Sequence, residues 1–269
     1  MTDSRALVIQ NSPSDPVRRL GDWLQDAGLE LNVVKPHAGD QVPDTLEGHA
    51  ALVVLGGPQS SYGAPDGAGA PWFAAERRLM RSAVEARVPT LAICLGAQLL
   101  AEAYGGRVAP AQAGPEIGPR LVARRDVAGA DPLFAEVPFT PDVMQWHFDE
   151  IVELPAGATL LAASPEYPHQ AFRVGARAWA LQFHIECDEE LVTAWARKDG
   201  PRLSELDPDA GVGLIGRDPE ELAQVCRAAL DDMVAVWRPF AERFAALARG
   251  RLDLDAAQDP MRRLAILGE

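Results

Sequence analysis

Short runs of apolar and often β-branched residues recur along the first hundred positions, and each run is closed by Gly, Pro or Asp. Runs of this length between turn residues are typical of buried strands, which we expect at residues 6–9, 31–34, 51–55 and 90–93. Between them, apolar positions at helical spacing predict helices over residues 15–27 and 71–86. Strands that alternate with helices predict a parallel sheet covered on both faces.

After Gly105-Gly106 the pattern changes to short strands separated by Pro- and Gly-rich turns. These strands are expected around residues 121–123, 159–163, 171–174 and 179–183. Their spacing favours an antiparallel or mixed continuation of the sheet. We therefore predict an α/β fold of the flavodoxin-like kind, with three layers and a central mixed, mostly parallel sheet.

The last quarter of the chain predicts a helical extension. Residues 198–216 are polar and contain Gly, Pro and Asp, as linkers do. Asp218-Pro219-Glu220-Glu221 then combines an N-cap, a proline at the first helical position and acids at the positive end of the helix dipole. An apolar stripe continues at helical spacing to Leu247, with a kink expected at Pro239. We expect one domain over 1–197, and over 198–269 a linker and helices that pack on it.

Composition narrows the class of protein. The chain has 269 residues, of which 48% are hydrophobic, and a net charge of −14 that opposes binding to phosphate backbones, so no nucleic-acid partner is expected. The three cysteines lack CxxC spacing, which favours a reducing compartment. The first apolar run is too short for a signal peptide or a membrane span, so a cytoplasmic location is expected. Histidines and cysteines lack ligand spacing, so we expect neither a metal nor another cofactor.

The strongest local signal surrounds Cys94. A buried strand ends at this cysteine and a helix-forming run follows at once, with small residues two positions before and after it, Ala92 and Gly96. This pattern predicts a nucleophile elbow, in which the first helical turn aims N–H groups at the sulfur and favours the thiolate. A buried structural cysteine is the alternative interpretation.

A thiolate nucleophile needs a base, usually a histidine held by a carboxylate. His184 and Glu186 follow the predicted strand at 179–183, and strand alternation places both side chains on the same side. A second glycine turn, Gly56-Gly57-Pro58, follows the strand at 51–55. Acyl transfer requires two N–H donors for the oxyanion, and we assign these to Leu95 and Gly57. Taken alone, a His-x-Glu is usually a surface pair and Gly-Gly-Pro an ordinary turn.

Together these pieces resemble the class I, or triad, glutamine amidotransferase family. The resemblance lies in Gly56-Gly57-Pro58, in the run from Ile93 to Gln98, and in the run from Gln182 to Glu186, in the family's order. Within the family, the chain is similar to the amidotransferase domain of guanosine monophosphate synthetase. Two positions depart from the common pattern: Ile185 stands where proline is frequent, and Ala97 where a larger residue is frequent.

The resemblance implies that Cys94 forms a γ-glutamyl thioester while His184 shuttles the proton and Glu186 orients the imidazole. It also implies contacts between the substrate's glutamyl part and a set of pocket residues: Gln98, Ile117, Gly118, His147, Phe148 and Asp149. For the last three residues a strand-end turn is an equal alternative.

Three functions remain open from the sequence. The leading one is hydrolysis of the glutamine side-chain amide, with ammonia passed to a separate synthetase or acceptor enzyme. That partner is needed because the sequence contains no P-loop. The second is a stand-alone γ-glutamyl hydrolase or peptidase, and the third is a non-catalytic binding or regulatory protein of the same fold.

Overall fold

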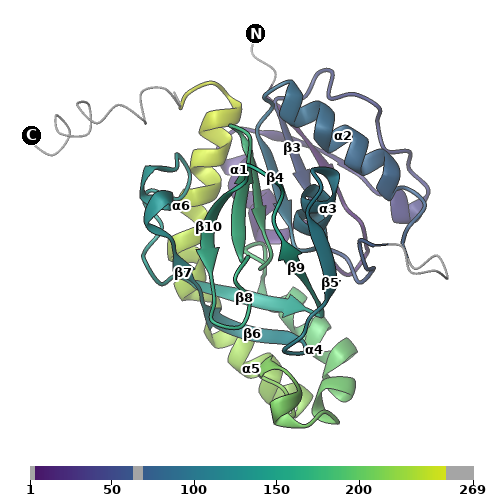
Figure 1. Ribbon diagram of the computed structural model, residues 1–269, viewed down its shortest axis with the longest axis vertical. Helices are drawn as coiled ribbons and strands as arrows, with labels where there is room; N and C mark the ends of the chain where they lie inside the picture. The colour runs from purple at the N-terminus through teal and green to yellow at the C-terminus, as the bar shows by residue number, and fades with distance from the viewer. Residues whose placement is uncertain (1–3, 63–68, 253–269) are drawn as a thin grey trace, which may run out of the picture.

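The computed structural model describes residues 4–62 and 69–252. An eight-stranded sheet forms its centre (Figure 1), and the first five strands run parallel while the last three join antiparallel. In spatial order the strands are β2 (Glu30–Val34), β1 (Arg5–Ile9), β3 (Ala51–Val54), β4 (Thr90–Ile93), β12 (Ala178–Leu181), β11 (Ala171–Val174), β10 (Thr159–Ala163) and β7 (Ala123–Arg124). The predicted mixed, mostly parallel sheet is confirmed.

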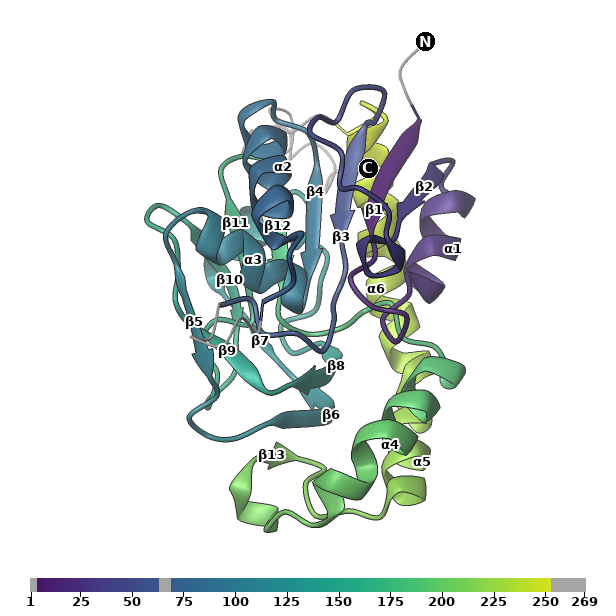
Figure 2. The same ribbon diagram turned by 90° about the vertical axis from the view of Figure 1, so that its right-hand side faces the viewer.

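Helices cover both faces of this sheet, as Figure 2 shows. One face carries α2 (Phe73–Glu85) and α3 (Leu95–Ala103), and the other carries α1 (Arg18–Asp26) and α6 (Leu230–Ala248). Side chains of β3 alternate between the two cores: Leu52 and Val54 join one cluster, and Ala51 and Val53 join the other. This two-sided burial explains why the strands read as continuous apolar runs.

Two smaller sheets lie beside the main one, and the sequence did not predict most of their strands. One consists of β13 (Val212–Gly213), β6 (Glu116–Leu121) and β8 (Asp142–His147), and the other of β5 (Arg107–Pro110) and β9 (Asp149–Glu153). Three short 3₁₀ helices complete the elements: η1 (Pro36–Ala38), η2 (Asp126–Ala130) and η3 (Pro208–Ala210). The strand expected at residues 121–123 is divided between the end of β6 and the start of β7.

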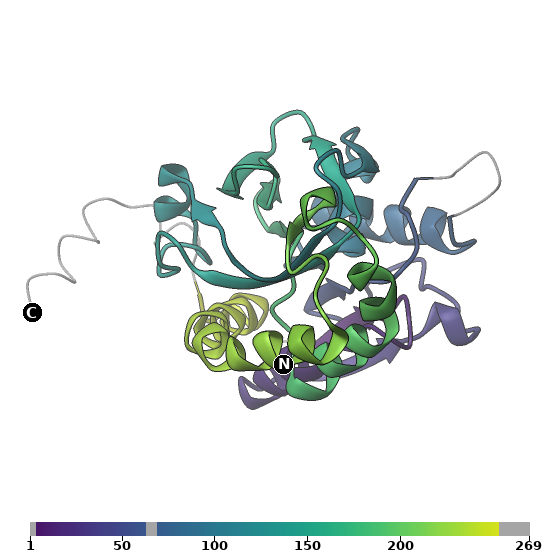
Figure 3. The same ribbon diagram turned by 90° about the horizontal axis from the view of Figure 1, so that it is seen from below.

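The C-terminal part differs from the predicted order of a linker followed by a helical stretch with a kink at Pro239. Residue 198, where the linker was expected to begin, lies inside α4 (Glu189–Ser204), which packs beside α5 (Pro219–Ala228) at the foot of the molecule (Figure 3). Gly200 reads as a linker residue, yet any side chain there would press on Pro219, so the glycine permits close helix packing. The Asp218 N-cap is as predicted, but the helical stretch breaks at Ala229, and Pro239 lies within α6.

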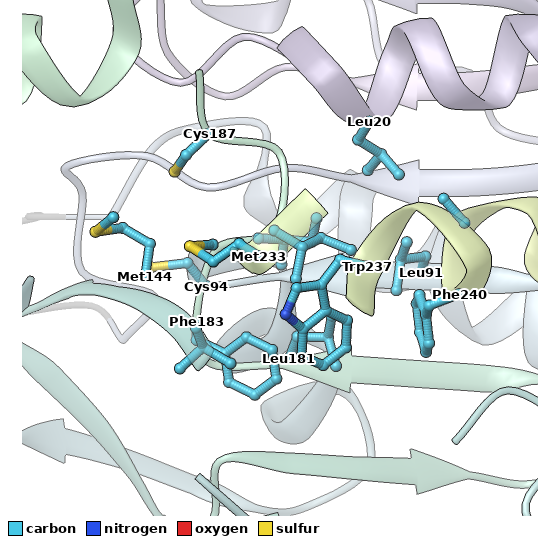
Figure 4. Close-up of a cluster of buried hydrophobic side chains, with 14 of the residues drawn as sticks. Leu20, Leu91, Cys94, Met144, Leu181, Phe183, Cys187, Met233, Trp237 and Phe240 are labelled. Carbon is cyan, nitrogen blue, oxygen red and sulfur yellow. The ribbon is translucent and has the colours of Figure 1, made fainter. Parts of the chain in front are cut away.

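Helix α6 belongs to the main hydrophobic core. Trp237 is fully buried, stacks at an angle on Phe183 with ring centroids 5.2 Å apart, and donates from Nε1 to the Asp142 carbonyl at 2.8 Å. Figure 4 shows Trp237 and Met233 beside Phe183, with Cys94 nearby. The C-terminal helices are therefore part of the wall behind the candidate site.

One buried carboxylate within α2 predicts a pH-dependent stability. Glu76 is fully buried, and in the described part of the chain neither of its oxygens completes a hydrogen bond. Burial raises its pKa to about 8, opposed only in part by Asn11 and Arg77. Because the folded state then holds this proton more tightly than the unfolded state, stability should fall as pH rises from about 4.5 to about 8.

We expect Glu76→Gln to remove this loss. Between pH 5 and pH 9 the wild type should lose on the order of 4 kcal/mol more unfolding free energy than the variant, since one pKa unit is about 1.4 kcal/mol. Urea unfolding at both pH values measures the difference. Glu85→Gln, at an exposed position of the same helix, serves as the control. Parallel pH profiles for wild type and Glu76→Gln would contradict the prediction.

Candidate active site

Cys94 occupies a strained corner between β4 and α3. Its φ of 51° and ψ of −109° lie outside the regions that a non-glycine residue prefers, as a nucleophile elbow requires. The corner is held by two backbone hydrogen bonds, from Cys94 N to the Leu181 carbonyl at 2.8 Å and from Gln98 N to the Cys94 carbonyl at 3.0 Å. The N–H groups of the first α3 turn have no partner within the helix and are free to act as donors.

Gly96 allows α3 to pack directly on β3 behind this corner. A Cβ at position 96 would overlap the backbone carbonyl of Val54, which cannot rotate away. We therefore expect Gly96→Ala to displace the elbow, to cost about 2 kcal/mol of unfolding free energy and to reduce activity at least about tenfold. Thermal unfolding and a γ-glutamyl hydrolysis assay measure both effects. Gly129→Ala is the control because a Cβ there would meet nothing within 4 Å.

His184 and Glu186 form a buried pair beside the cysteine. Glu186 Oε1 accepts from His184 Nδ1 at 2.7 Å, and both side chains are about 1% exposed. Strand β12 ends at Leu181, so His184 is fixed instead by an isolated bridge to Met144 of β8, with His184 N donating to the Met144 carbonyl at 2.8 Å. The Glu186 carbonyl accepts from Arg19 N of α1 at 3.1 Å. Two separate elements thus hold the pair in place.

The electrostatics of this pair favour a charged imidazole. Burial works to lower the pKa of His184, but the charges of Glu186 and Cys94, and their hydrogen bonds to the ring, outweigh it and raise that pKa well above its ordinary value. Such an environment stabilises an imidazolium next to a thiolate. By contrast, burial raises the pKa of Cys187 and brings that of Cys226 to about 12, so these two thiols stay protonated.

Ile185, which departs from the common family pattern, contributes a hydrogen bond of its own. Its backbone N–H donates to Glu186 Oε2 at 2.9 Å, so both oxygens of that carboxylate are held. A proline at this position would have no N–H to donate. The isoleucine therefore fixes Glu186 by hydrogen bonding where a proline would fix the backbone by its ring.

A cleft of about 430 Å³ opens above the cysteine, which is within the range of about 300–1,000 Å³ for small-molecule sites. Gly57 lines this cleft and lies against the Leu95 side chain. A Cβ at Gly57 would be only 2.9 Å from Leu95 Cδ2. The two residues predicted as oxyanion donors are thus neighbours across the glycine turn and the elbow.

Four of the six residues predicted to contact the substrate line this cleft: Gln98, His147, Phe148 and Asp149. Several of their polar groups already form hydrogen bonds within the protein. The Asp149 carboxylate accepts from Ser60 Oγ at 2.8 Å and from Tyr62 OH at 2.9 Å, which ties the loop after β3 to β9. His147 Nε2 lies 2.9 Å from Glu116 Oε2.

Ile117 and Gly118 do not line the cleft. Their strand β6 pairs with β8 on one side and with β13 on the other, and the Ile117 carbonyl accepts from Leu214 N at 3.0 Å. Gly118 is covered by the Leu214 side chain. The cleft therefore does not include these two residues, and their contact with a substrate stays a prediction.

Sequence reasoning missed two parts of the cleft. Asp15 was expected to begin a helix, but α1 starts at Arg18 and Asp15 lines the cleft instead. Helix α4 contributes Trp195, whose ring lies 4.7 Å from His184, together with further lining residues: Lys198, Asp199 and Arg202. The proline that follows Asp15 was the available signal for a later helix start.

Neither a metal site nor a membrane span emerges from the residues that the structure describes. Within residues 4–62 and 69–252 no group of three or more His, Cys, Asp or Glu side chains is arranged to hold a metal ion. Over the same ranges no helix has the length and hydrophobicity needed to cross a bilayer.

Comparison with known proteins decides the family. The model for the class-I glutamine amidotransferase family matches residues 15–191, about two thirds of the chain. The chain belongs to this family. A solved glutamine amidotransferase from Thermotoga maritima superimposes on 90% of the chain and 98% of its own length, with a TM-score of 0.77 and 26% identity.

This class-I glutamine amidotransferase matches its curated relatives over different shares of their length. It is 33% identical over 172 residues to the glutamine amidotransferase-like protein YfeJ of Salmonella typhimurium, covering 63% of the chain and 70% of that protein. It is 28% identical to gamma-glutamyl peptidase 3 of Arabidopsis thaliana, covering 56% of the chain and 61% of that protein. The glutamine-hydrolyzing GMP synthase of Thermomicrobium roseum is 39% identical, over 50% of the chain but only 23% of its own length.

Proposed function

We propose that the protein hydrolyses γ-glutamyl amides through a thioester on Cys94, with glutamine as the simplest substrate. One observation carries this proposal: a buried imidazole, hydrogen-bonded to Glu186, lies beside a strained cysteine that lines the cleft. A buried structural cysteine would need neither the strained corner nor an adjacent charged imidazole.

The chemistry follows from these positions. The Cys94 thiolate attacks the amide carbon, and the oxyanion that forms accepts hydrogen bonds from the backbone N–H groups of Leu95 and Gly57. The C–N bond then breaks, its electron pair leaves with nitrogen, and His184 gives that nitrogen its proton. Water, deprotonated by His184, releases glutamate from the thioester and restores the thiolate.

Glu186 keeps the ring oriented through these steps and stabilises the imidazolium, as the carboxylate of a catalytic triad does. Gln98 would contact the glutamyl part, since its Nε2 lies in the cleft within 3.4 Å of the Asp149 carbonyl and 3.3 Å of Gln182 Oε1. These two weak contacts can be exchanged for a substrate carbonyl or carboxylate at little cost.

Two uses of this chemistry follow from the relatives. GMP synthase is named for glutamine hydrolysis coupled to synthesis, and this chain spans only 23% of the T. roseum protein, so a comparable role would need an acceptor activity beyond the matched residues. A stand-alone γ-glutamyl hydrolase is the second candidate. It is favoured by the similarity to gamma-glutamyl peptidase 3, of which the chain spans 61%.

Purified protein incubated with glutamine and with γ-glutamyl dipeptides tests both candidates. Release of ammonia from glutamine, increased by a partner enzyme, would support the amidotransferase role. Release of free amino acids from dipeptides at a higher kcat/KM, without a partner, would support the hydrolase. Absence of turnover with every γ-glutamyl compound would refute the proposal and favour a non-catalytic member of the fold.

A further inference from the structure

Asp15 places a second carboxylate in the cleft, separate from Glu186. The residue is 7% exposed and lies in the loop between β1 and α1, where Ser14 and Asp15 both line the cleft. Its Oδ2 accepts a short hydrogen bond from Ser14 Oγ at 2.6 Å. This contact fixes the side chain and leaves Oδ1 as the oxygen that faces the reacting groups.

Three groups converge on the space above Gly56. The position that a Cβ on Gly56 would occupy is 3.1 Å from His184 Cε1, 3.3 Å from Asp15 Oδ1 and 3.5 Å from Cys94 Cβ. The absence of a side chain at Gly56 thus allows carboxylate, imidazole and nucleophile to approach one another. Asp15 Oδ1 and His184 Cε1 border the same space, and the charge of His184 acts on the Asp15 carboxylate.

That edge is where a leaving group must depart. Nδ1 is occupied by Glu186, so only Nε2 can pass a proton to the departing nitrogen. Because Asp15 Oδ1 borders the space above Gly56 that the imidazole also borders, we take it as the acceptor for the remaining N–H bonds of that nitrogen. The groups that act on this carboxylate are His184, Glu186, Ser12 and Ser14; burial raises its pKa, and the Ser14 hydrogen bond and the His184 charge oppose that rise.

Helix α4, which adjoins the Asp15 loop through a hydrogen bond from Trp195 Nε1 to the Ser14 carbonyl, brings two positive charges to the cleft beside Asp199. Lys198 and Arg202, one turn apart on α4, are exposed at the cleft, and neither forms an ion pair within the described ranges. The Arg202 guanidinium lies over the Phe148 ring, 4.6 Å from its centroid, in the segment expected to contact the glutamyl part. The Arg202 guanidinium beside Phe148 is suited to a substrate α-carboxylate, whereas Asp15 places a carboxylate beside His184, where the amine would leave.

We propose that Asp15 is a specificity-determining residue that selects γ-glutamyl amides whose leaving amine carries no carboxylate. The inference rests on the proposed function. As the C–N bond breaks, Oδ1 accepts one N–H hydrogen bond from the departing nitrogen, which directs the nitrogen lone pair toward the Nε2 proton of His184; no proton moves to Asp15. A leaving group with a carboxylate beside its nitrogen, as in a γ-glutamyl amino acid, would bring two negative charges together in a low-dielectric site.

Kinetics with two matched substrates test the proposal on the full-length chain. We expect the wild type to hydrolyse γ-glutamylmethylamide with a kcat/KM at least about tenfold above that for γ-glutamylglycine. Asp15→Asn should shrink this ratio at least about fivefold, because it removes the charge at nearly constant size. Asp22→Asn, an exposed carboxylate on α1, should leave the ratio unchanged.

Alkylation of Cys94 by a γ-glutamyl chloroketone supplies a readout without a leaving amine, and Asp15→Asn should alter its rate less than about threefold. A wild-type ratio near one would overturn the role of Asp15 while leaving γ-glutamyl hydrolysis intact. This outcome is measured on the wild type, so it does not depend on whether a variant folds. A ratio that stays high in Asp15→Asn would also overturn it. If the wild type hydrolyses neither substrate but releases ammonia from glutamine, this inference fails and the proposed function stands. If glutamine is not hydrolysed either, both fail.

Discussion

Cys94→Ala is expected to reduce γ-glutamyl amide hydrolysis by about 10⁴-fold or more, because it removes the atom that forms the thioester. Stability should change little or improve. The backbone strain at this corner is the same for either side chain, and alanine is smaller than cysteine and crowds His184 and Gln182 less. Ammonia release from glutamine measures the first effect, and urea unfolding measures the second.

Cys226→Ala is the matched control for this prediction. Cys226 is fully buried within α5 and its thiol has a raised pKa of about 12, so its loss should affect packing and leave kcat within about threefold of the wild type. Activity that survives in Cys94→Ala, or that disappears in Cys226→Ala with the fold intact, would contradict the assignment of the nucleophile.

Glu186→Gln is expected to lower kcat by roughly 10³-fold with a small change in KM. The amide can still accept from His184 Nδ1, but it no longer offers the negative charge that opposes burial and raises the imidazole pKa. The imidazolium would lose its main stabilising partner. A pH profile of kcat/KM should therefore differ in shape between variant and wild type.

Glu205→Gln, at an exposed position just after α4, controls for the general effect of removing a negative charge and should leave the rate unchanged. An equal loss of activity in both variants would indicate an effect of net charge. Nearly wild-type kcat in Glu186→Gln would show that His184 needs no carboxylate partner, and the triad interpretation would fail.

The sequence predicts the parallel half of the fold well because burial on both faces makes each strand a continuous apolar run. Residues 6–9 and 90–93 illustrate this, since they coincide closely with β1 and β4. The smaller sheets were missed because β6 and β8 carry buried polar residues, such as Glu116 and His147, which satisfy each other at 2.9 Å. Apolar periodicity carries no signal for a strand that is stabilised in this way.

The C-terminal helices show a second limit of pattern reading. Residues 198–204 contain Gly200 and Pro201 and were interpreted as a linker, but Gly200 lies where α4 meets Pro219 of α5. Local propensity favours a loop there, and the tertiary contact requires a helix with a small residue. In the stripe that begins in α5, Leu222 is buried but Val225 is exposed, and the break at Ala229 has no Pro or Gly to signal it.

The residues of the candidate site also differ in how well the sequence predicts them. Cys94, His184 and Glu186 could be named as candidates because short motifs next to strand ends mark them. Asp15 could not, because its role depends on a neighbour 41 positions later, Gly56, and on the late start of α1. Ile117 and Gly118 were carried over by resemblance alone, and pairing with β13 keeps them out of the cleft.

The central claim is that one of three buried cysteines is a nucleophile for γ-glutamyl compounds. Mass spectrometry of the intact chain after exposure to a γ-glutamyl chloroketone, followed by peptide mapping, tests it most directly. A single adduct on the peptide that contains Cys94, formed more slowly when glutamine is present, is the predicted result. An adduct on Cys187 or Cys226 instead, or labelling that glutamine does not slow, would contradict the account.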